Sequence, residues 1–430
     1  MFQSDRAQFR VGVTDVQVTI VMPCLNEIQS LPHCIANAQE ALRRIEKIHG
    51  FAGEIVIADN GSTDGSQALA LSLGARVVPV AARGYGAALI GGCQSAHGRF
   101  ILMGDCDGSY DFIDGVEMIG QLVEGHALCM GSRFDGGIAP GAMPWKNRYI
   151  GNPVLTGILN LFFRAGINDA HCGLRAIRKE SFLRLKLTGT GMEFASEMVI
   201  KAALLKFPIT QVPATLSPDL RDRAPHLRPW RDGWRHLRYL LMLSPTWVFG
   251  MPALFALGLG MLVMLTAVLF TFGVIGGERV FGESWIVGAG FLITIGHLSA
   301  VMAMATHFLG VVSGYRTIRP SLRFARRFLS LEASLAIGFV ALAFSTVTLL
   351  AVGDYWRSTG FVALPSILPV VIGAVSGVIG MQTILGGFLL AIIAGHKAEF
   401  GRQLTEFLPN DGEPDVLTFD DAPIVSRSVA

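Results

Sequence analysis

Acidic side chains follow three of the apolar runs in the first half of the chain. Glu27 comes shortly after the first run, Asp59 ends the second, and Asp105 and Asp107 follow a later one. Two carboxylates separated by one residue can hold a hard divalent cation, which commonly bridges them to a diphosphate. We therefore predict a site for Mg²⁺ or Mn²⁺ at Asp105 and Asp107, whose oxygen ligands suit either cation. Turns and helix caps are the alternative role of such residues, and we assign that role to Asp64.

The elements that must position these side chains alternate between strand and helix. Apolar residues recur at helical spacing from Leu31 to Ile48. Short apolar runs that alternate with helices predict an α/β fold with a parallel sheet covered on both faces. Ligands of such sheets bind at the carboxyl ends of the strands, so we expect the acidic residues to converge there. The predicted strands are 16–22, 54–58, 75–80, 100–103 and 127–130.

The composition excludes an all-soluble protein. The 430 residues are 51% apolar and 16% charged, and the formal charge of +2 gives no indication of a nucleic-acid partner. Four stretches carry no Asp, Glu, Lys or Arg, and each reaches the ~20 residues that a helix needs to cross a membrane. These four predicted spans are 239–277, 284–315, 333–353 and 358–396.

Arginines predict the orientation of these spans. Lys and Arg resist translocation, and the loop between the second and third spans carries an excess of them, whereas the other two loops do not. That loop, both termini and the globular first half are therefore expected to be cytoplasmic. The start of the chain has no apolar stretch typical of a signal peptide, and the six cysteines are expected to be unpaired thiols. The expected location is the inner (cytoplasmic) membrane. The loop arginines are Arg316, Arg319, Arg323, Arg326 and Arg327.

A segment rich in Trp and Arg comes just before the first span. On a helix, Trp230 and Trp234 share one face with leucines, and Arg231 and Arg235 share another. This pattern is typical of a helix that lies in the membrane interface and contacts lipid headgroups. The predicted organisation is a catalytic domain over 1–227, this interfacial helix over 228–244, a four-span domain over 245–396 and an acidic disordered tail over 397–430.

Five motifs of the first half occur in the order of a known family. They resemble family 2 glycosyltransferases with the Rossmann-like GT-A fold, and most of all the dolichol-phosphate mannose or glucose synthases and their bacterial polyprenyl-phosphate relatives. The resemblance covers residues 16–240, and the four spans are similar to the membrane domain that follows the catalytic domain in some of these synthases. The motifs are P-x-x-N-E from Pro23, D-N-G-S-x-D-G from Asp59, R-G-x-G-x-A from Arg83, D-x-D from Asp105 and G-S-R from Gly131.

The resemblance implies that a nucleotide-diphosphate sugar, with UDP or GDP, binds at the first four motifs. Asp107 would ligate the divalent metal with Asp105. Some family members continue D-x-D with Leu-Gln, whereas Gly108 and Ser109 follow here, so Ser109 or a water is the candidate third ligand. The residues that would line the donor site are Pro23, Asn26, Glu27, Asp59, Arg83 and Asp105.

The resemblance also implies that arginines bind the phosphate of a lipid acceptor. The planar guanidinium suits this role because it binds phosphate oxygens bidentately and stays charged. Arg178 and Arg184 are expected to be ordinary surface residues. The candidates are Arg133, Arg148 and Arg175, with Arg221, Arg223 and Arg228 in a segment similar to a later basic loop of the synthases.

The expected reaction is the inverting transfer of a hexose to a polyprenyl (dolichyl or undecaprenyl) phosphate at the cytoplasmic face. A phosphate monoester has a second pKa near ~6, so it attacks without a general base. The first alternative is a lipid hydroxyl acceptor such as diacylglycerol or ceramide, for which Glu193 or Glu197 would be the base. The second is a non-catalytic membrane carrier that senses nucleotide-sugar, with His297 and His307 inside a span.

Small residues in the last span predict close helix packing. Gly373 and Gly377 form a small-x-x-x-small pair, which Gly380 extends. We expect this surface to pack within the chain, and a homo-oligomer contact is the alternative.

Overall fold

The computed structural model describes residues 16–221, 229–276, 281–317, 330–396 and 398. These residues form two compact units, one that ends at Leu243 and one that begins at Ser244. Several predictions lie outside the described residues. They concern the acidic tail, Arg223 and Arg228, and every arginine of the loop between spans two and three except Arg316.

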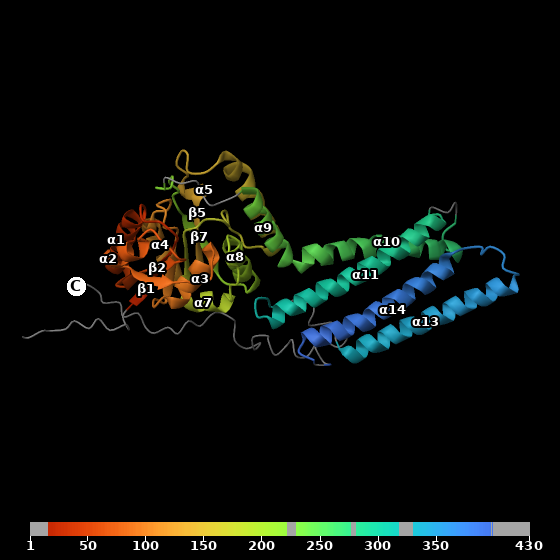
Figure 1. The fold of residues 1–430 in the computed structure, drawn as a ribbon. Helices are drawn as coiled ribbons and strands as arrows, with labels where there is room; N and C mark the ends of the chain where they lie inside the picture. Colours follow the sequence, from red (N-terminus) through yellow and green to blue (C-terminus); the bar gives the residue numbers. More distant parts are fainter. Residues whose placement is uncertain (1–15, 222–228, 277–280, 318–329, 397, 399–430) are drawn as a thin grey trace, which may run out of the picture. The chain divides into compact units, whose positions relative to one another are not determined.

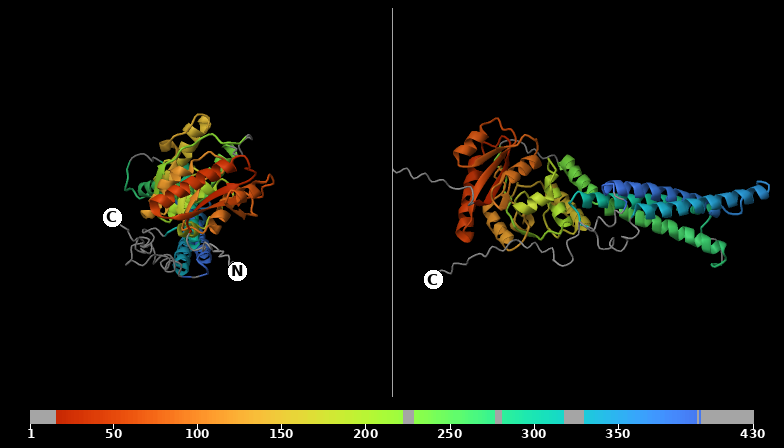
Figure 2. Two further views of the ribbon diagram at one scale, coloured as in Figure 1. Left: turned by 90° about the vertical axis from the view of Figure 1, so that its left-hand side faces the viewer. Right: turned by 90° about the horizontal axis from the view of Figure 1, so that it is seen from below.

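The first unit is a seven-stranded sheet with helices on both faces (Figures 1 and 2). The strand order is β3-β2-β1-β4-β6-β5-β7. All five predicted strands are confirmed. The strands are β1 Val16–Cys24, β2 Ala52–Asp59, β3 Arg76–Pro79, β4 Phe100–Met103, β5 Leu128–Ser132, β6 Arg175–Arg178 and β7 Ile209–Pro213.

The sheet is mixed, so the prediction of a wholly parallel sheet is wrong. β6 runs antiparallel to both of its neighbours, β4 and β5, whereas the pairs that include β1, β2, β3 and β7 are parallel. The four residues of β6 include two arginines, and so short and charged a segment has no apolar run by which to recognise it. β7 was missed for a similar reason, since only Val212 of its five residues is buried.

The topology positions the site at the carboxyl ends of β1 and β4. The chain goes from β1 outward to β2 and β3, and then returns to place β4 on the other side of β1. Such a reversal opens a crevice at the carboxyl edge of the sheet, and that crevice is where ligands of α/β proteins bind. The segments 24–27 and 104–109 both leave the sheet at this point.

Helix α1, Leu31–His49, illustrates how the sequence forms the elements beneath the site. Pro32 lies in its first turn, and Gly50 ends it in the left-handed conformation (φ 71°) that glycine adopts without strain. Its apolar stripe, which includes Leu31 and Ile35, is buried against the sheet as predicted. The other helices of the unit are α2 Ser66–Ser72, α3 Tyr85–Ser95, α4 Gly115–Val123, α5 Arg133–Gly136, α6 Asn152–Phe163, α7 Lys179–Leu185, α8 Phe194–Leu204 and α9 Pro229–Met242, with short helices η1 Phe112–Asp114 and η2 Asn147–Gly151.

Helix α9 covers the segment that we predicted to be interfacial. It packs against α6 and α8, and its residues His236 and Leu240 are buried. His236 Nδ1 lies 2.8 Å from Ser196 Oγ of α8. Trp234, on the predicted membrane face, is 59% exposed. The side chain of Trp230 lies outside the described residues, and contact of α9 with lipid stays a proposal.

Among its described residues, the second unit contains four helices that are long and apolar enough to cross a membrane, which confirms the four predicted spans. The first span begins with the short helix η3 Thr246–Gly250, which α10 Met251–Thr271 continues. The other three are α11 Glu283–Val312, α13 Leu331–Ser358 and α14 Leu368–Ile393. Which side of the membrane each loop occupies stays a prediction.

Small residues bring α14 close to α13 in the same chain. A Cβ atom added at Gly377 would lie 2.7 Å from Ser345 Oγ, and one added at Gly380 would lie 2.7 Å from the carbonyl oxygen of Gly338. His297 of α11 also has partners on α14, because its ring nitrogens lie 2.9 Å from Gln382 Oε1 and 3.3 Å from Thr383 Oγ1. Packing within the chain therefore accounts for these residues, and His297 acts as a structural contact between helices.

Candidate active site

A cavity of about 440 Å³ lies at the carboxyl ends of β1, β2 and β4. Three of the acidic residues that the sequence predicted to converge line it together, namely Glu27, Asp105 and Asp107. The full lining consists of Pro23, Cys24, Leu25, Glu27, Asn60, Arg83, Gly84, Tyr85, Ala88, Asp105, Cys106, Asp107, Met192 and Arg221.

Asp59, the last residue of β2, does not line this cavity. Its buried carboxylate accepts hydrogen bonds from the backbone N–H groups of Gly61 and Ser62, at 3.0 and 3.2 Å, and from Gln67 Nε2 at 2.6 Å. These bonds hold the turn that follows β2. In this structure Asp59 is therefore an organiser of the turn, and its predicted contact with a nucleobase stays untested.

Asn26 and Asn60 position two loops of the donor site. Asn26 takes a left-handed conformation (φ 58°), and its Oδ1 accepts a hydrogen bond from Thr63 N at 2.8 Å. Asn60 donates to the carbonyl oxygen of Ala82 at 2.7 Å and accepts from Gly84 N at 2.7 Å. Asn60 thus ties β2 to the loop that carries Arg83.

The start of α3 brings Arg83 and Tyr85 to the cavity. Gly84 has φ 130°, and a Cβ atom added at Gly84 or at Gly86 would collide with backbone carbonyls of the segment 189–191. Only glycine allows this close approach. Tyr85 lies between these two glycines, and the sequence analysis missed it because it stands at the variable position of the motif R-G-x-G-x-A.

The segment 104–109, which we call the DxD loop, presents both predicted metal ligands. Asp107 Oδ1 accepts hydrogen bonds from Ser109 N at 3.0 Å and from Ser109 Oγ at 2.6 Å. Asp105 is hydrogen-bonded to Tyr85, and a Cβ atom added at Gly173 would lie 2.7 Å from Asp105 Oδ2. Asp105 is thus enclosed from two sides, which leaves little room for a larger residue at 173.

Burial, together with the negative charge of Asp107, raises the pKa of Asp105 to about 7. An unfolded aspartate has a pKa of about 3.9, so the folded protein binds this proton more tightly and loses stability as the pH rises from about 4 to about 7. Asp105→Asn removes this loss. We expect it to raise the unfolding temperature of the protein in EDTA more at pH 8 than at pH 5. Glu117→Gln, an exposed change on α4, serves as the control, and an equal gain for Asp105→Asn at both pH values would contradict the prediction.

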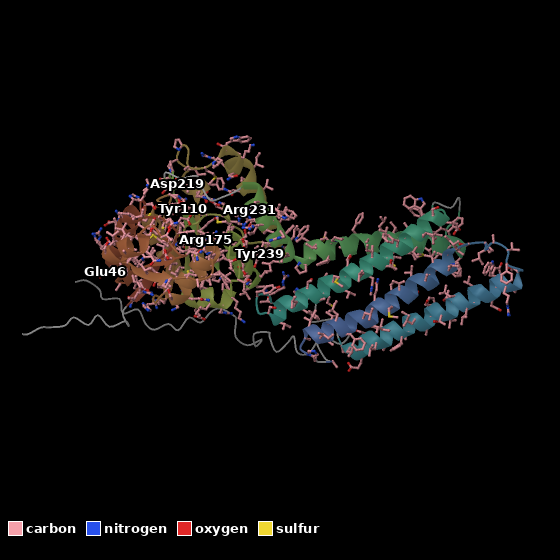
Figure 3. All side chains as sticks on the ribbon, viewed as in Figure 1. Glu46, Tyr110, Arg175, Asp219, Arg231 and Tyr239 are labelled. Atoms are coloured by element: carbon pink, nitrogen blue, oxygen red, sulfur yellow. The ribbon has the colours of Figure 1, made fainter. Side chains whose placement is uncertain are left out.

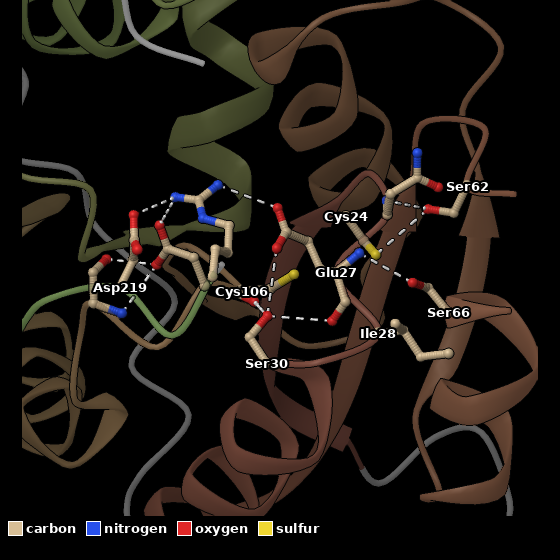
Figure 4. Close-up of polar contacts among 12 residues, drawn as sticks. Cys24, Glu27, Ile28, Ser30, Ser62, Ser66, Cys106 and Asp219 are labelled. Carbon is tan, nitrogen blue, oxygen red and sulfur yellow. Dashed lines mark hydrogen bonds and ion pairs between the residues drawn. The ribbon is translucent and has the colours of Figure 1, made fainter. Parts of the chain in front are cut away.

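Arg221 joins the acidic residues of two different strand ends (Figure 4). Its guanidinium contacts Glu27 Oε1 at 3.2 Å, Asp107 Oδ2, and Asp219 Oδ2 at 3.4 Å. From the sequence, Arg221 is predicted only to be part of a basic loop. Its ion pair with Glu27 spans 194 positions of the chain, and no local pattern reveals such a contact.

The predicted acceptor arginines have different surroundings, and two of them have partners inside the protein. Arg133 forms a two-pronged ion pair with the buried Asp169, at 2.6 and 2.8 Å. Arg175, which is labelled in Figure 3, is 2% exposed. It donates to the backbone carbonyls of Cys172, Ala195 and Ala170. Arg148 alone of the three is only partly buried, and it lies against the ring of Tyr149. A lipid phosphate would have to compete with Asp169 for Arg133.

Glu193 and Glu197, the candidate bases for a hydroxyl acceptor, have different surroundings. Glu197 is buried in an ion pair with Lys201 at 2.7 Å, and it accepts hydrogen bonds from the backbone N–H groups of Thr188 and Gly189. These contacts give Glu197 a structural role. Glu193 accepts one hydrogen bond from Gly191 N at 3.0 Å, and its buried Oε2 has no hydrogen-bond partner among the described residues.

The residues of the DxD loop fit a divalent cation that substrate helps to hold. No three His, Cys, Asp or Glu side chains within the described part of the chain gather closely enough to form a ligand set of their own. Asp105 and Asp107 nevertheless both line the cavity, and Ser109 Oγ lies 2.6 Å from Asp107 Oδ1. Mg²⁺ is usually bound in this way, by one or two carboxylates with water and substrate phosphates.

Comparison with known proteins agrees with this arrangement. The profile of Glycosyl transferase family 2 matches residues 19–185, and that of the Glycosyltransferase family 2 C-terminal transmembrane region matches residues 304–394. A low-salt glycan biosynthesis hexosyltransferase of Haloferax volcanii is 35% identical over 375 residues, which are 87% of this chain and 88% of the relative. A dolichyl-phosphate hexose transferase of the same organism is 27% identical over 46% of this chain and 81% of its own length.

The solved structures that a comparison matched to this chain include a glucosyl-3-phosphoglycerate synthase from Mycobacterium tuberculosis in complex with Mn²⁺, UDP and glucosyl-3-phosphoglycerate. It is 20% identical, with a TM-score of 0.40, over 53% of this chain and 80% of its own.

The chain belongs to glycosyltransferase family 2. Its first unit is the Rossmann-like GT-A domain of that family, and its second unit carries four apolar helices. It is therefore a membrane glycosyltransferase, which sets aside the alternative of a non-catalytic carrier.

Proposed function

We propose that this enzyme transfers a hexose from a nucleotide-diphosphate sugar to a polyprenyl phosphate. One observation carries the proposal: the unit that holds the acidic donor cavity also exposes a surface suited to a lipid. The printed names of two relatives, a dolichyl-phosphate hexose transferase and a dolichyl-phosphate beta-glucosyltransferase, support the same acceptor class.

The lipid-facing surface, as we propose it, is formed by η2, α6 and the residues just before them. Trp145 is 62% exposed and Tyr149 is 67% exposed. Each of these rings has a cation beside it, since Lys146 Nζ lies 6.0 Å from the ring centre of Trp145 and Arg148 Cζ lies 5.5 Å from that of Tyr149. Exposed apolar patches mark binding surfaces, and aromatic rings beside cations are typical of a membrane interface. The aliphatic members of the surface are Ile150, Val154 and Leu161.

In the proposed reaction, an oxygen of the lipid phosphate attacks the anomeric carbon of the sugar. The bond from that carbon to the donor diphosphate breaks, and the nucleoside diphosphate leaves, so the anomeric configuration inverts. Asp105 and Asp107 would hold a divalent cation that neutralises the departing diphosphate. Arg148 lies on the lipid-facing surface and is the candidate ligand for the acceptor phosphate. We assign to Arg133 and Arg175 the task of positioning the segment 169–175 beside Asp105.

Removing the two exposed rings should weaken use of the long-chain acceptor. For the double variant Trp145→Ala and Tyr149→Ala we expect the KM for a long-chain polyprenyl phosphate to rise about thirtyfold. Each ring that inserts into lipid contributes on the order of 1 kcal/mol or more, so the two together contribute about 2 kcal/mol. The kcat with a short, water-soluble prenyl phosphate should not change. Leu183→Ala, at a 50% exposed leucine of α7, is the matched control. Equal losses with both acceptors would show that the rings support the fold and not lipid binding.

A hydroxyl acceptor is the second candidate, because Glu193 has a buried carboxylate oxygen without a hydrogen-bond partner among the described residues. A hydroxyl needs a base, whose removal costs about 10²–10⁴-fold in rate. Glu193→Gln therefore separates the two routes. If Glu193→Gln keeps near-normal turnover on polyprenyl phosphate, the acceptor is a phosphate. If Glu193→Gln loses about 10²–10⁴-fold in rate and the wild type is fully active on a lipid alcohol, the acceptor is a hydroxyl.

A further inference from the structure

Arg221 places a positive charge among the carboxylates of the donor cavity. Its Nη1 contacts Glu27 at the end of β1, and its Nη2 contacts Asp107 of the DxD loop and Asp219 of its own segment (Figure 4). The side chains of Glu27 and Asp107 are 8% and 11% exposed. Two carboxylates that are this poorly hydrated repel each other unless a cation lies between them.

The backbone around Arg221 is attached to the DxD loop independently of the guanidinium. Ser217 N donates to the carbonyl oxygen of Ser109 at 2.9 Å, and Leu220 N donates to that of Asp107 at 2.9 Å. A Cβ atom added at Gly108 would lie 2.6 Å from Leu220 Cδ1, so the leucine packs directly on the loop. The base of the Arg221 side chain is thus fixed beside Asp107, while its long stem leaves the guanidinium able to change partner.

The hydrogen bonding of Arg221 is incomplete. Its Nε is buried and has no hydrogen-bond partner among the described residues. An unsatisfied buried donor costs free energy, and more so on a charged group. Arg221 lines the cavity, and a diphosphate bound there has several oxygen atoms. Such an anion could accept hydrogen bonds from Nε and from the Nη atoms at the same time.

The ion pair of Arg133 with Asp169 shows what a permanent contact looks like in the same unit. There both carboxylate oxygens bind the guanidinium, through Nε and Nη2, and the two side chains are 9% and 0% exposed. Arg221 differs because its carboxylate partners come from three separate segments and it borders an open cavity. A fixed structural bridge would not need to face the cavity.

We propose that Arg221 is an exchangeable internal cation of the donor site. It neutralises Glu27 and Asp107 before the donor binds, and it releases Asp107 when a divalent cation enters with a nucleoside diphosphate. Its guanidinium then binds the diphosphate oxygens. This inference rests on the proposed use of a nucleotide-diphosphate donor, and it is independent of the identity of the acceptor.

The proposal requires that Arg221 act in opposite directions on two binding events. It competes with a divalent cation that binds alone, because both need Asp107. It cooperates with the cation once a diphosphate is present, because the released guanidinium gains the phosphate oxygens as partners. If Arg221 were only structural, its removal would weaken the binding of both the cation and the diphosphate. The direction in which each Kd changes therefore distinguishes the two roles.

The test uses the full-length protein in detergent and the variants Arg221→Gln and Arg221→Lys. The first measurement is the Kd of Mn²⁺ alone, from the electron paramagnetic resonance signal of free Mn²⁺. The second is the Kd of UDP and of GDP, measured separately in saturating Mn²⁺ by calorimetry. Arg76→Gln is the matched control, since Arg76 forms an ion pair with Glu54 by two bonds of 2.9 Å outside the cavity lining.

For Arg221→Gln we expect the Kd of Mn²⁺ alone to fall about five- to tenfold, and the Kd of the preferred nucleoside diphosphate to rise about tenfold or more. Arg221→Lys keeps the positive charge but lacks the planar guanidinium with its paired N–H donors. It should therefore still compete with Mn²⁺ but lose part of the affinity for the diphosphate. An unchanged or higher Kd of Mn²⁺ alone, in a variant with wild-type unfolding temperature, would overturn the proposal, as would an unchanged Kd of the diphosphate. If the wild type binds neither UDP nor GDP with Mn²⁺, the proposed donor itself is wrong.

Discussion

Replacing Asp107 by asparagine should reduce hexose transfer about a thousandfold. The carboxylate would contribute charge to a cation on the donor diphosphate, an interaction of several kcal/mol in the transition state, and each 1.36 kcal/mol is a factor of ten in rate. Asp107 also holds the DxD loop in shape through Ser109, at 2.6 Å from its Oγ. Asparagine keeps an acceptor oxygen for that bond, so the loss should come from charge and not from misfolding.

Two measurements separate the causes in Asp107→Asn. Its unfolding temperature in EDTA should fall by only a few degrees, because Arg221 keeps Glu27 and Asp219 as partners. Its Mn²⁺ affinity in the presence of nucleoside diphosphate should fall together with kcat. Glu117→Gln removes one negative charge from the exposed face of α4 and should leave the rate unchanged. If Asp107→Asn kept a tenth or more of the wild-type rate, the DxD loop would not be the metal site.

Replacing Asp169 by alanine should have the largest effect on stability. Asp169 is fully buried and neutralises Arg133, whose side chain is 9% exposed. Removing one partner of a buried ion pair leaves the other charge without compensation and typically costs about 3–5 kcal/mol. For a domain of this size such a loss corresponds to a fall of roughly 10 °C in unfolding temperature.

This prediction also tests the role of Arg133. Asp135→Ala, at an exposed residue two positions after Arg133, is the control and should change the unfolding temperature little. If Asp169→Ala were as stable as the wild type, the ion pair would be dispensable, and Arg133 would be free to serve as the acceptor-phosphate ligand that the sequence suggested.

The parts of the fold that could be predicted from the sequence are those with a repeated apolar pattern. β4 has the predicted limits, 100–103, because its four residues are all apolar and all buried. The four membrane helices could also be predicted, since an uncharged apolar stretch of more than about 18 residues is typical of a membrane span. β6 is a short strand with two arginines whose pairing depends on β4 and β5, and these lie far from it in the chain.

In the candidate active site, too, some features could be predicted from the sequence and others depend on tertiary packing. The convergence of Glu27, Asp105 and Asp107 could be predicted because topology alone brings the ends of β1 and β4 together. The internal partners of Arg175 could not, because they are three backbone carbonyls whose positions depend on tertiary packing. The basic character of Arg221 follows from its residue type, but its ion pairs could not be predicted. They depend on how segment 216–221 lies against the DxD loop.

The proposed acceptor, a polyprenyl phosphate, can be tested with the purified full-length protein. The protein is incubated with undecaprenyl or dolichyl phosphate, a divalent cation and a panel of radiolabelled UDP- and GDP-hexoses. We expect a single hexose joined to the lipid phosphate, of inverted anomeric configuration, with Asp107→Asn as the inactive control. A product formed only on a lipid alcohol, with none on either polyprenyl phosphate, would rule out this acceptor.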